Sequence, residues 1–321
     1  MRRSVLRALS AALILMAAFA GPAAAQGRPL QVVATTAMIG DAAKAVGGER
    51  VRVEVLLGQG VDPHLYKPTR ADIAKMSKAD VIVANGLNLE AQFRDTFEQL
   101  GRTKPVLLAG ERLPKDKLLA DPNYPDKPDP HVWMDPDLWT GVIGAVRDAL
   151  AARDPAGKSA YDQGHDRYVA EIARLSDYVK RVLATIPRDK RLLLTAHDAF
   201  SYFSRTYDIE VIGIQGVSTE SEAGLKAIES TVDLVVSRKL PSIFVESSVS
   251  DRNVRAVVEG AARRGHALVI GAELFSDAMG APGAYEGTYL GMIDHNVTTI
   301  TRALGGEAPQ RGLHGRLGAA S

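Results

Sequence analysis

The chain of 321 residues contains no cysteine, and this absence limits the chemistry that the protein can use. Without thiols there can be no disulfide framework, no zinc site built on thiolates and no iron–sulfur cluster. The lipid anchor of bacterial lipoproteins is also excluded, because that anchor is attached to a cysteine. Any metal ion must therefore be held by histidine nitrogen and by oxygen.

The chain also has almost no excess of charge, with 39 Lys and Arg residues against 38 Asp and Glu residues. No block of basic residues interrupts this balance, so nucleic acid is not an expected partner. The chain that remains after the first 25 residues is long enough for two domains of ordinary size, and we expect a monomer.

A single apolar run, at about residues 9–20, is too short to span a membrane as a helix. Arg2, Arg3 and Arg7 precede the run and three alanines close it, which is typical of a secretory signal peptide cleaved after Ala25. The neighbouring arginines leave both Sec and twin-arginine export open. We therefore expect a periplasmic protein without a membrane anchor.

Short apolar runs rich in β-branched residues alternate with helical patterns along the remaining chain. This alternation predicts an α/β fold with mostly parallel sheets flanked by helices. Helices are expected at 69–78 and 222–237, among others. The expected strands are 30–36, 51–58, 79–86, 191–196, 209–214, 242–248 and 267–273.

One helical pattern is much longer than the others. Asp154 and Pro155 predict its first turn, and one apolar face then continues until Pro187. At about 1.5 Å per residue this helix would form a rigid rod of roughly 45 Å. The chain is therefore predicted to have four parts. They are a signal peptide (1–25), an N-terminal α/β lobe (26–153), a linking helix (154–187) and a C-terminal α/β lobe (188–321).

The two lobes also resemble each other in sequence. VEVLLGQGV at 53–61 and IEVIGIQGV at 209–217 share Glu, Gln, Gly and Val at the same offsets. In each half, an earlier strand enters a helix through a threonine, at 32–46 and at 192–203. These matches indicate an internal duplication and hence two pseudo-symmetric lobes with a cleft between them. Ligands of such sheets bind at the carboxyl ends of the strands.

Four polar residues are expected at those strand ends. His64 and His131 each follow an Asp-Pro pair, in VDPHLYKP and DPHVWMDP, and proline holds such a turn at little entropic cost. His197 follows the strand RLLLT, and Asp277 follows ALVIGAELFS. Three imidazoles and one carboxylate form a nitrogen and oxygen site for one first-row divalent ion such as zinc or manganese.

The remaining polar and aromatic residues are assigned supporting roles. Metal-bound imidazoles usually donate their second N–H to a carboxylate or a carbonyl group. The candidates for this role are Asp62, Asp198, Glu220 and Glu246, each of which could equally cap a helix or lie in solvent. An apolar shell is expected from Trp133, Tyr66 and Phe275. The histidines expected to be structural or exposed are His165, His266, His295 and His314.

These motifs resemble the metal-binding solute-binding proteins of zinc and manganese ABC importers (cluster A-I, or cluster 9), from about residue 30 to 305. The likeness is greatest to the TroA-type subgroup, which has three histidines and one aspartate. The resemblance implies metal ligands at His64, His131, His197 and Asp277, two lobes joined by a rigid helix, and delivery of the ion to a membrane permease. The motifs are VDPHLYKPTRADIAKMSKADVIVANGLNLE, DPHVWMDP, TAHDAFSYFSRTYDIEVIGIQGVSTESE, VESSVS and ELFSDAMG.

The sequence departs from the zinc-dedicated members of that family in one loop. They usually carry a histidine-rich loop before the second ligand, whereas LPKDKLLADPNYPDKPDP contains no histidine. The expected cargo is therefore manganese and zinc, with iron third.

Two other functions are left open. A metallohydrolase would need an open coordination position and an adjacent base, and neither HExxH nor GxSxG is present. A protein of the same fold that binds a chelated ligand, such as a siderophore or cobalamin, would need aromatic and arginine contacts instead of imidazoles.

Overall fold

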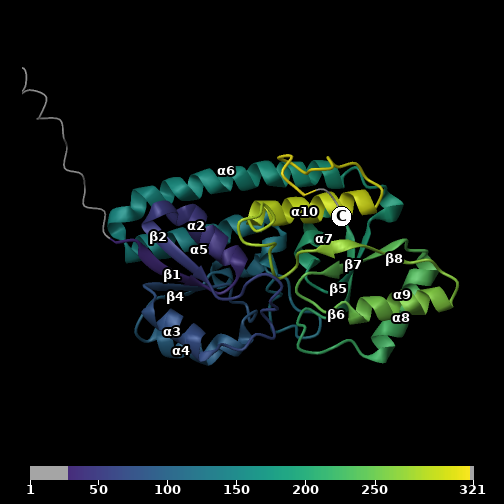
Figure 1. The fold of residues 1–321 in the computed structure, drawn as a ribbon, viewed down its shortest axis with the longest axis horizontal. Coiled ribbons are helices and arrows are strands. Elements are labelled where there is room, and N and C mark those ends of the chain that lie inside the picture. The colour runs from purple at the N-terminus through teal and green to yellow at the C-terminus, as the bar shows by residue number, and fades with distance from the viewer. Residues whose placement is uncertain (1–27, 319–321) are drawn as a thin grey trace, which may run out of the picture.

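The structure is a computed structural model that describes residues 28–318, so the predicted signal peptide, 1–25, lies outside the described residues. Figure 1 shows two α/β halves side by side, with the long helix α6 running along both of them. Within residues 28–318, none of the helices combines the length and the apolar character needed to cross a bilayer.

The first half is built on a four-stranded parallel sheet with the order β2-β1-β3-β4. Three of its strands fall where the sequence predicts them. The strand β4 was not predicted, because its three residues are too few for a periodic pattern. The strands are β1 (Leu30–Ala34), β2 (Val51–Val55), β3 (Val81–Ala84) and β4 (Val106–Leu108).

The second half repeats this arrangement. The strand β5 pairs with β6 and β7 pairs with β8, both in parallel, and β5 lies beside β7. The four strands thus lie in the order β6-β5-β7-β8, as an internal duplication predicts, but they form two two-stranded sheets instead of one four-stranded sheet. The strands are β5 (Leu192–His197), β6 (Glu210–Gln215), β7 (Ser242–Glu246) and β8 (Val269–Leu274).

Side-chain caps determine where several helices begin. The Thr69 hydroxyl accepts the Asp72 backbone N–H while the Asp72 carboxylate accepts that of Thr69, which is a capping box. Asp135 caps α5 by accepting the backbone N–H groups of Asp137 and Leu138, with Pro136 at the first helical position. The helices other than α6 are α2 (Ala37–Gly47), α3 (Arg70–Lys78), α4 (Arg94–Gly101), α5 (Pro136–Arg153), α7 (Ser201–Tyr207), α8 (Leu225–Arg238), α9 (Arg252–Arg263) and α10 (Tyr289–Ala303).

The linking helix α6 spans Lys158–Leu183 and is shorter at both ends than the predicted 154–187. A 3-10 turn, Pro155–Gly157, precedes it. At its other end the backbone N–H groups of Thr185 and Ile186 bond to carbonyl groups three residues earlier, which tightens the chain before Pro187. Its 26 residues correspond to a rod of about 40 Å. The predicted lobe boundaries, 26–153 and 188–321, stay a prediction.

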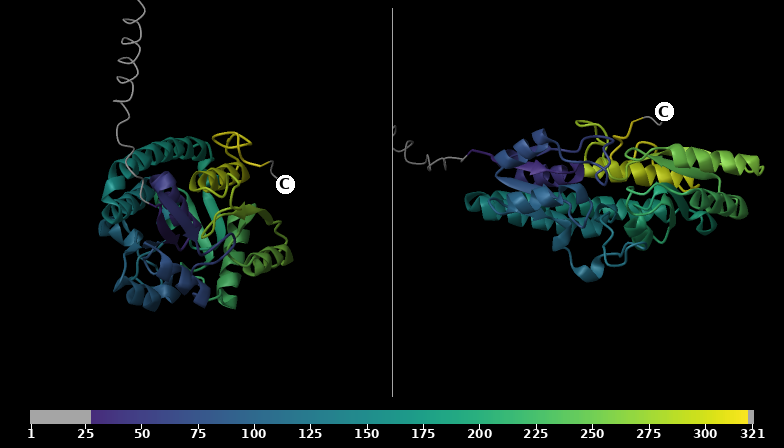
Figure 2. Two further views of the ribbon diagram at one scale, coloured as in Figure 1. Left: turned by 60° about the vertical axis from the view of Figure 1, so that its left-hand side comes forward. Right: turned by 90° about the horizontal axis from the view of Figure 1, so that it is seen from below.

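The largest apolar core is continuous between the halves. It contains buried residues of β1, of α2, of the surfaces where α5 and α6 meet, and of α10. Helix α10 packs along α6 and also contacts α2, and the end-on view in Figure 2 shows these helices gathered on one side of the sheets. Smaller clusters fill the other face of each sheet. The linking helix is therefore only one part of an extended apolar contact between the halves.

Candidate metal centre

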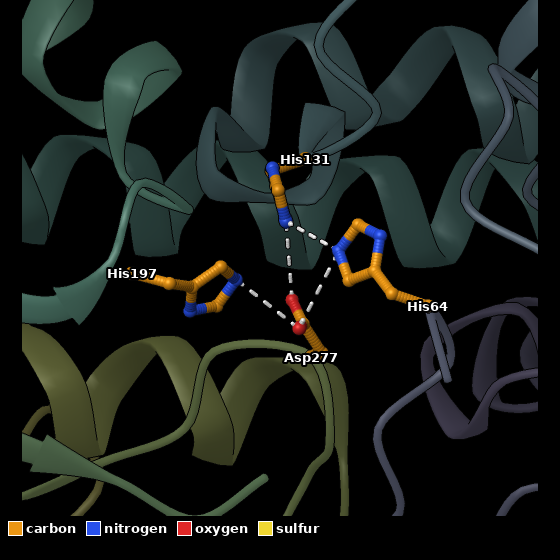
Figure 3. Close-up of side chains that lie close together, drawn as sticks. All are labelled: His64, His131, His197 and Asp277. Atoms are coloured by element: carbon orange, nitrogen blue, oxygen red, sulfur yellow. Dashed lines mark hydrogen bonds and ion pairs between the residues drawn. The ribbon is translucent and has the colours of Figure 1, made fainter. Parts of the chain in front are cut away.

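The four residues expected at the strand ends come together between the two halves (Figure 3). His64 lies in the loop after β2, and His131 lies directly before the 3-10 turn Val132–Met134. His197 is the last residue of β5, and Asp277 follows the end of β8. Two of the residues thus come from each half, and all lie beyond the carboxyl ends of parallel strands, as the fold predicts.

Their donor atoms have the spacing of a single metal site. Nε2 of His64 lies 3.4 Å from Nε2 of His131, which lies 3.3 Å from Oδ1 of Asp277. Oδ2 of Asp277 lies 3.2 Å from Nε2 of His197 and 3.8 Å from Nε2 of His64. All four donor groups fall within 4.8 Å of one another. Around an ion with bonds of about 2.1 Å, tetrahedral donors would be about 3.4 Å apart.

The site is closed to water, and its central atoms lack partners. His64 is 3% exposed, Asp277 2%, and the other two histidines 0%. Both carboxylate oxygens of Asp277 and Nε2 of His197 make no well-aligned hydrogen bond to any described residue, although Asp277 lies within ion-pair distance of the imidazoles. Buried polar groups in proteins are nearly always satisfied, and each exception indicates a missing ligand, ion or water. Three of the ten such side-chain atoms among the described residues belong to this one site.

Two of the imidazoles are oriented from behind by carboxylates. Nδ1 of His131 lies 2.7 Å from Oδ1 of Asp129, and Nδ1 of His197 lies 2.5 Å from Oε2 of Glu246. With a carboxylate on this side, the ring donates through Nδ1–H and leaves Nε2 free to bind a cation. The prediction for Glu246 is confirmed. The role of Asp129 was missed, although the Asp-Pro-His motif contains it.

The other three carboxylate candidates do not contact an imidazole. Asp62 accepts the backbone N–H of His64, and Asp198 accepts the hydroxyl of Ser201 beside α7. Glu220 is exposed and accepts the side-chain amide of Gln92. The expectation of an imidazole partner is therefore wrong for these residues. Each has a nearer donor, so the alternative of a loop or capping role holds.

Burial and the neighbouring charges give the three imidazoles of the site different pKa values. Burial lowers the pKa of His64 to about 3. Burial would also lower the pKa of His131, but the carboxylates of Asp129 and Asp277 outweigh it and raise this pKa to about 9. Burial likewise opposes protonation of His197, yet the carboxylates on both of its sides hold its pKa well above the ordinary value. Burial alone would raise the pKa of Asp277, but the charged imidazoles of His197 and His131 outweigh burial and hold this pKa well below its usual range.

The surroundings of the site are apolar, in part as expected. The buried Trp133 ring packs edge-on against His131, with ring centroids 5.2 Å apart. Phe275 packs against His295 instead of a ligand, and Tyr66 stacks on Phe93. The histidines expected to lie outside the site are indeed outside it, and they are His165, His266, His295 and His314.

Residues 32–303 match the sequence model of the family described as zinc-uptake complex component A, periplasmic. The chain belongs to this family. This membership confirms the resemblance to metal-binding solute-binding proteins that was predicted from the motifs around His64 and His131.

Individual members of the zinc-uptake component A family are similar along nearly their whole length. The chain is 42% identical over 276 residues to the manganese-binding lipoprotein MntA of Bacillus subtilis (strain 168), covering 86% of this chain and 90% of the relative. It is 43% identical over 284 residues to the zinc-binding protein TroA of Treponema pallidum (strain Nichols), covering 88% and 91%.

Two further matches concern transport and fold. The chain is 33% identical over 290 residues to the manganese ABC transporter substrate-binding lipoprotein PsaA of Streptococcus mitis, covering 88% of this chain and 91% of the relative. The solved structure of the periplasmic zinc binding protein TroA superimposes with a TM-score of 0.84 at 42% identity, covering 87% of this chain and 99% of that structure. This match confirms the predicted α/β fold.

Proposed function

We propose that this member of the zinc-uptake component A family is the solute-binding component of an ABC importer. It captures one divalent transition-metal ion in the cleft and delivers it to a permease in the inner membrane. The proposed ligands are His64, His131, His197 and Asp277. The observation that carries this proposal is the set of buried, unpartnered donor atoms with the spacing of a single ion.

The same geometry argues against a chelated ligand. A siderophore or cobalamin would have to replace donor groups that lie within 4.8 Å of one another and are nearly inaccessible to solvent. This space suits a bare ion.

A metallohydrolase is disfavoured for a different reason. Hydrolysis would need a carboxylate free to act as a base beside an open coordination position. The carboxylates of Asp129 and Glu246 are both engaged with imidazoles. The relatives described above are named as binding proteins, which also supports capture without turnover.

The proposed cargo is manganese and zinc, with iron third. Three imidazoles and one carboxylate form a borderline donor set, for which the Irving–Williams order places zinc above manganese. Asp277 offers both oxygens to the centre and could thereby raise the coordination number for manganese. Two relatives are named for manganese and one for zinc, which supports the same pair.

Titration of the metal-free protein tests this function. We expect one equivalent of zinc or manganese to bind, zinc more tightly, and iron-siderophore or cobalamin not to bind. Replacing His131 or Asp277 by alanine removes a direct ligand. It should lower affinity by more than the roughly 10–100-fold that is typical when an outer partner of a ligand is lost.

His165→Ala is the matched control, because His165 lies on α6 and bonds to Asp166 away from the cleft. Its affinity should equal that of the wild type. Loss of metal from this variant to the same degree as from His131→Ala would contradict the assignment of ligands.

We further propose that the protein acts in the periplasm without a lipid anchor. Two of its relatives are named lipoproteins, but lipidation of that type requires a cysteine and this sequence contains none. Cell fractionation should recover a soluble periplasmic protein whose mass corresponds to cleavage after Ala25. Recovery with the membrane after a high-salt wash would contradict the proposal.

A further inference from the structure

Several hydrogen bonds hold the loop that carries His131 against the second half of the protein. Residues 129–135 make hydrogen bonds with four side-chain or main-chain groups that follow β5 in the chain. The bonds run from Tyr202 Oη to Asp129 O, from Trp133 Nε1 to Ser276 O, from Tyr289 Oη to Trp133 O and from Thr206 Oγ1 to Asp135 Oδ2, each 2.8 Å long. Since His197 and Asp277 belong to the second half, these three ligand candidates form one rigid group.

The loop that carries His64 makes fewer hydrogen bonds to the second half. Among the described residues, a single hydrogen bond joins the segment 56–69 to the second half. It runs from the Thr219 hydroxyl to Oδ2 of Asp62 and is 2.6 Å long. Oδ1 of the same carboxylate accepts the backbone N–H of His64 at 2.8 Å. One carboxylate therefore connects the opposite half directly to the backbone of a ligand candidate.

The His64 side chain has no other support of this kind. Its Nδ1 makes no hydrogen bond to another described residue, in contrast to the carboxylate-backed rings of His131 and His197. The position of the His64 imidazole consequently depends on the position of its backbone. That backbone depends on Asp62.

The duplication explains why these two loops meet. In the repeat that aligns 53–61 with 209–217, the next residues, Asp62 and His64, correspond to Ser218 and Glu220. The equivalent loops of the two sheets thus face each other at the cleft. Near this pair of loops a further bond between the halves, from Gln92 to Glu220, is exposed, whereas Thr219 is only 5% exposed.

We propose that Asp62 and Thr219 form a latch that holds His64 in the ligand position, and that opening of this latch sets the rate of metal release. The inference rests on the proposed function. Thr219 is a positioning residue, because it acts on the ion only through Asp62 and His64. A short hydrogen bond to a partly buried carboxylate is among the stronger ones, and its loss leaves a carboxylate oxygen without a partner.

Replacement of Thr219 by valine or serine tests the latch. Thr219→Val keeps the shape and removes the hydroxyl, whereas Thr219→Ser keeps the hydroxyl. Metal-loaded protein is mixed with excess EDTA, and the rate of manganese or zinc loss is followed. We expect loss about tenfold faster, or more, for the valine variant, the equivalent of one charge-assisted hydrogen bond, and a rate close to wild type for the serine variant.

Two further variants make the result specific. Thr231→Val removes a similarly buried hydroxyl that bonds to Ala227 within α8, and it should leave the release rate unchanged. In an Asp62→Ala background, Thr219→Val should add nothing, because its partner is already gone. A release rate for Thr219→Val equal to wild type, or an equal added effect in both backgrounds, would overturn the latch.

Hydrogen exchange of the metal-free protein separates this proposal from the proposed function. The backbone amide of His64 should exchange faster in Thr219→Val than in wild type, while the amide of His131 should not change. If the wild-type protein took up no metal, the proposed function would be refuted. The exchange rate of the His64 amide would still test whether Thr219 and Asp62 hold the His64 backbone. Unchanged exchange at His64 would overturn the latch even in a protein that binds metal.

Discussion

The Asp-Pro-His motif occurs twice in the chain, and its aspartate is used in two ways. In both copies one carboxylate oxygen accepts the backbone N–H of the histidine two residues later. In the second copy the same oxygen of Asp129 also receives the His131 ring. In the first copy the other oxygen of Asp62 turns away to Thr219. The same local turn therefore holds the ring of one ligand candidate directly and, in the other loop, connects the backbone of the second candidate to the opposite half.

The position of the ligand candidates could be predicted from the sequence, but the partners of their rings could only partly be predicted. Strand ends and rigid turns are local patterns, and the structure brings the residues chosen from them, including His197 and Asp277, close together. Whether an imidazole reaches Asp129 or Asp62 depends on its rotamer and on the opposite half. Glu246 was one of four carboxylates selected by their place along the chain, and only the structure shows that it ends β7 beside β5.

Metal binding should release protons at neutral pH. In the metal-free site the pKa of His131 is raised to about 9 and that of His197 is also well raised, so both rings are protonated at pH 7. The pKa of His64 is lowered to about 3, so this ring has no proton to lose. An ion must displace about two protons, whose charge it replaces. Affinity should therefore increase as pH rises, up to about pH 9 for the His131 step.

Calorimetry in buffers of different ionisation enthalpy measures this proton count. We expect about two protons per ion at pH 7, from His131 and His197. Unperturbed imidazoles, with a pKa near about 6.5, would instead release less than one proton in total at this pH. A count near zero would show that the carboxylates do not hold the two rings in the charged form.

At the scale of elements, the contact between α2 and α6 requires a residue without a side chain. Gly164 lies on the face of α6 that meets α2, and a Cβ atom there would overlap the carbonyl group of Val46. The obstacle is backbone, so it cannot move aside as a side chain would. This close approach brings the first half against the linking helix.

Gly164→Ala should therefore destabilise the protein although alanine favours helices. The gain in helix propensity is about 1 kcal/mol, whereas overpacking against backbone typically costs about 1–3 kcal/mol or more and would push α2 away from α6. Gly144→Ala in α5 is the matched control, because its nearest contact would be an ordinary one at 3.9 Å. Chemical denaturation should show lower stability for the first variant and equal or slightly higher stability for the second. Equal stabilisation of both would refute the packing argument.

The elements that the sequence predicted well are those with a long or strongly apolar pattern. The strands β1, β5 and β7 are almost wholly buried and lie at the predicted places. The strand β4 was not predicted because three residues are too few to show a periodic pattern. The helix α6 ends earlier than predicted because its last predicted residues form turns with hydrogen bonds between residues three apart. Such local choices depend on neighbouring elements that a sequence window does not contain.

At the scale of the whole molecule, the halves share one apolar core. Buried residues of the first sheet, α5, α6 and α10 belong to a single cluster, and its member Trp133 bonds to Ser276 and Tyr289 of the second half. The sequence predicted a rigid link through one helix but did not reveal this second, broader contact. Such a contact could not be predicted because its residues are far apart in the chain.

Metal binding should consequently change the overall shape very little. Separating the halves enough to expose even about 400 Å² of apolar surface would cost about 10 kcal/mol, which is comparable to the entire stability of a typical domain. Movement of the His64 loop costs far less, since one hydrogen bond holds it to the second half. X-ray scattering of metal-free and metal-loaded protein should give radii of gyration near about 19 Å that differ by no more than a few per cent. A sample reloaded after chelator treatment controls for aggregation, and a clear compaction on metal binding would show that the halves open as rigid bodies.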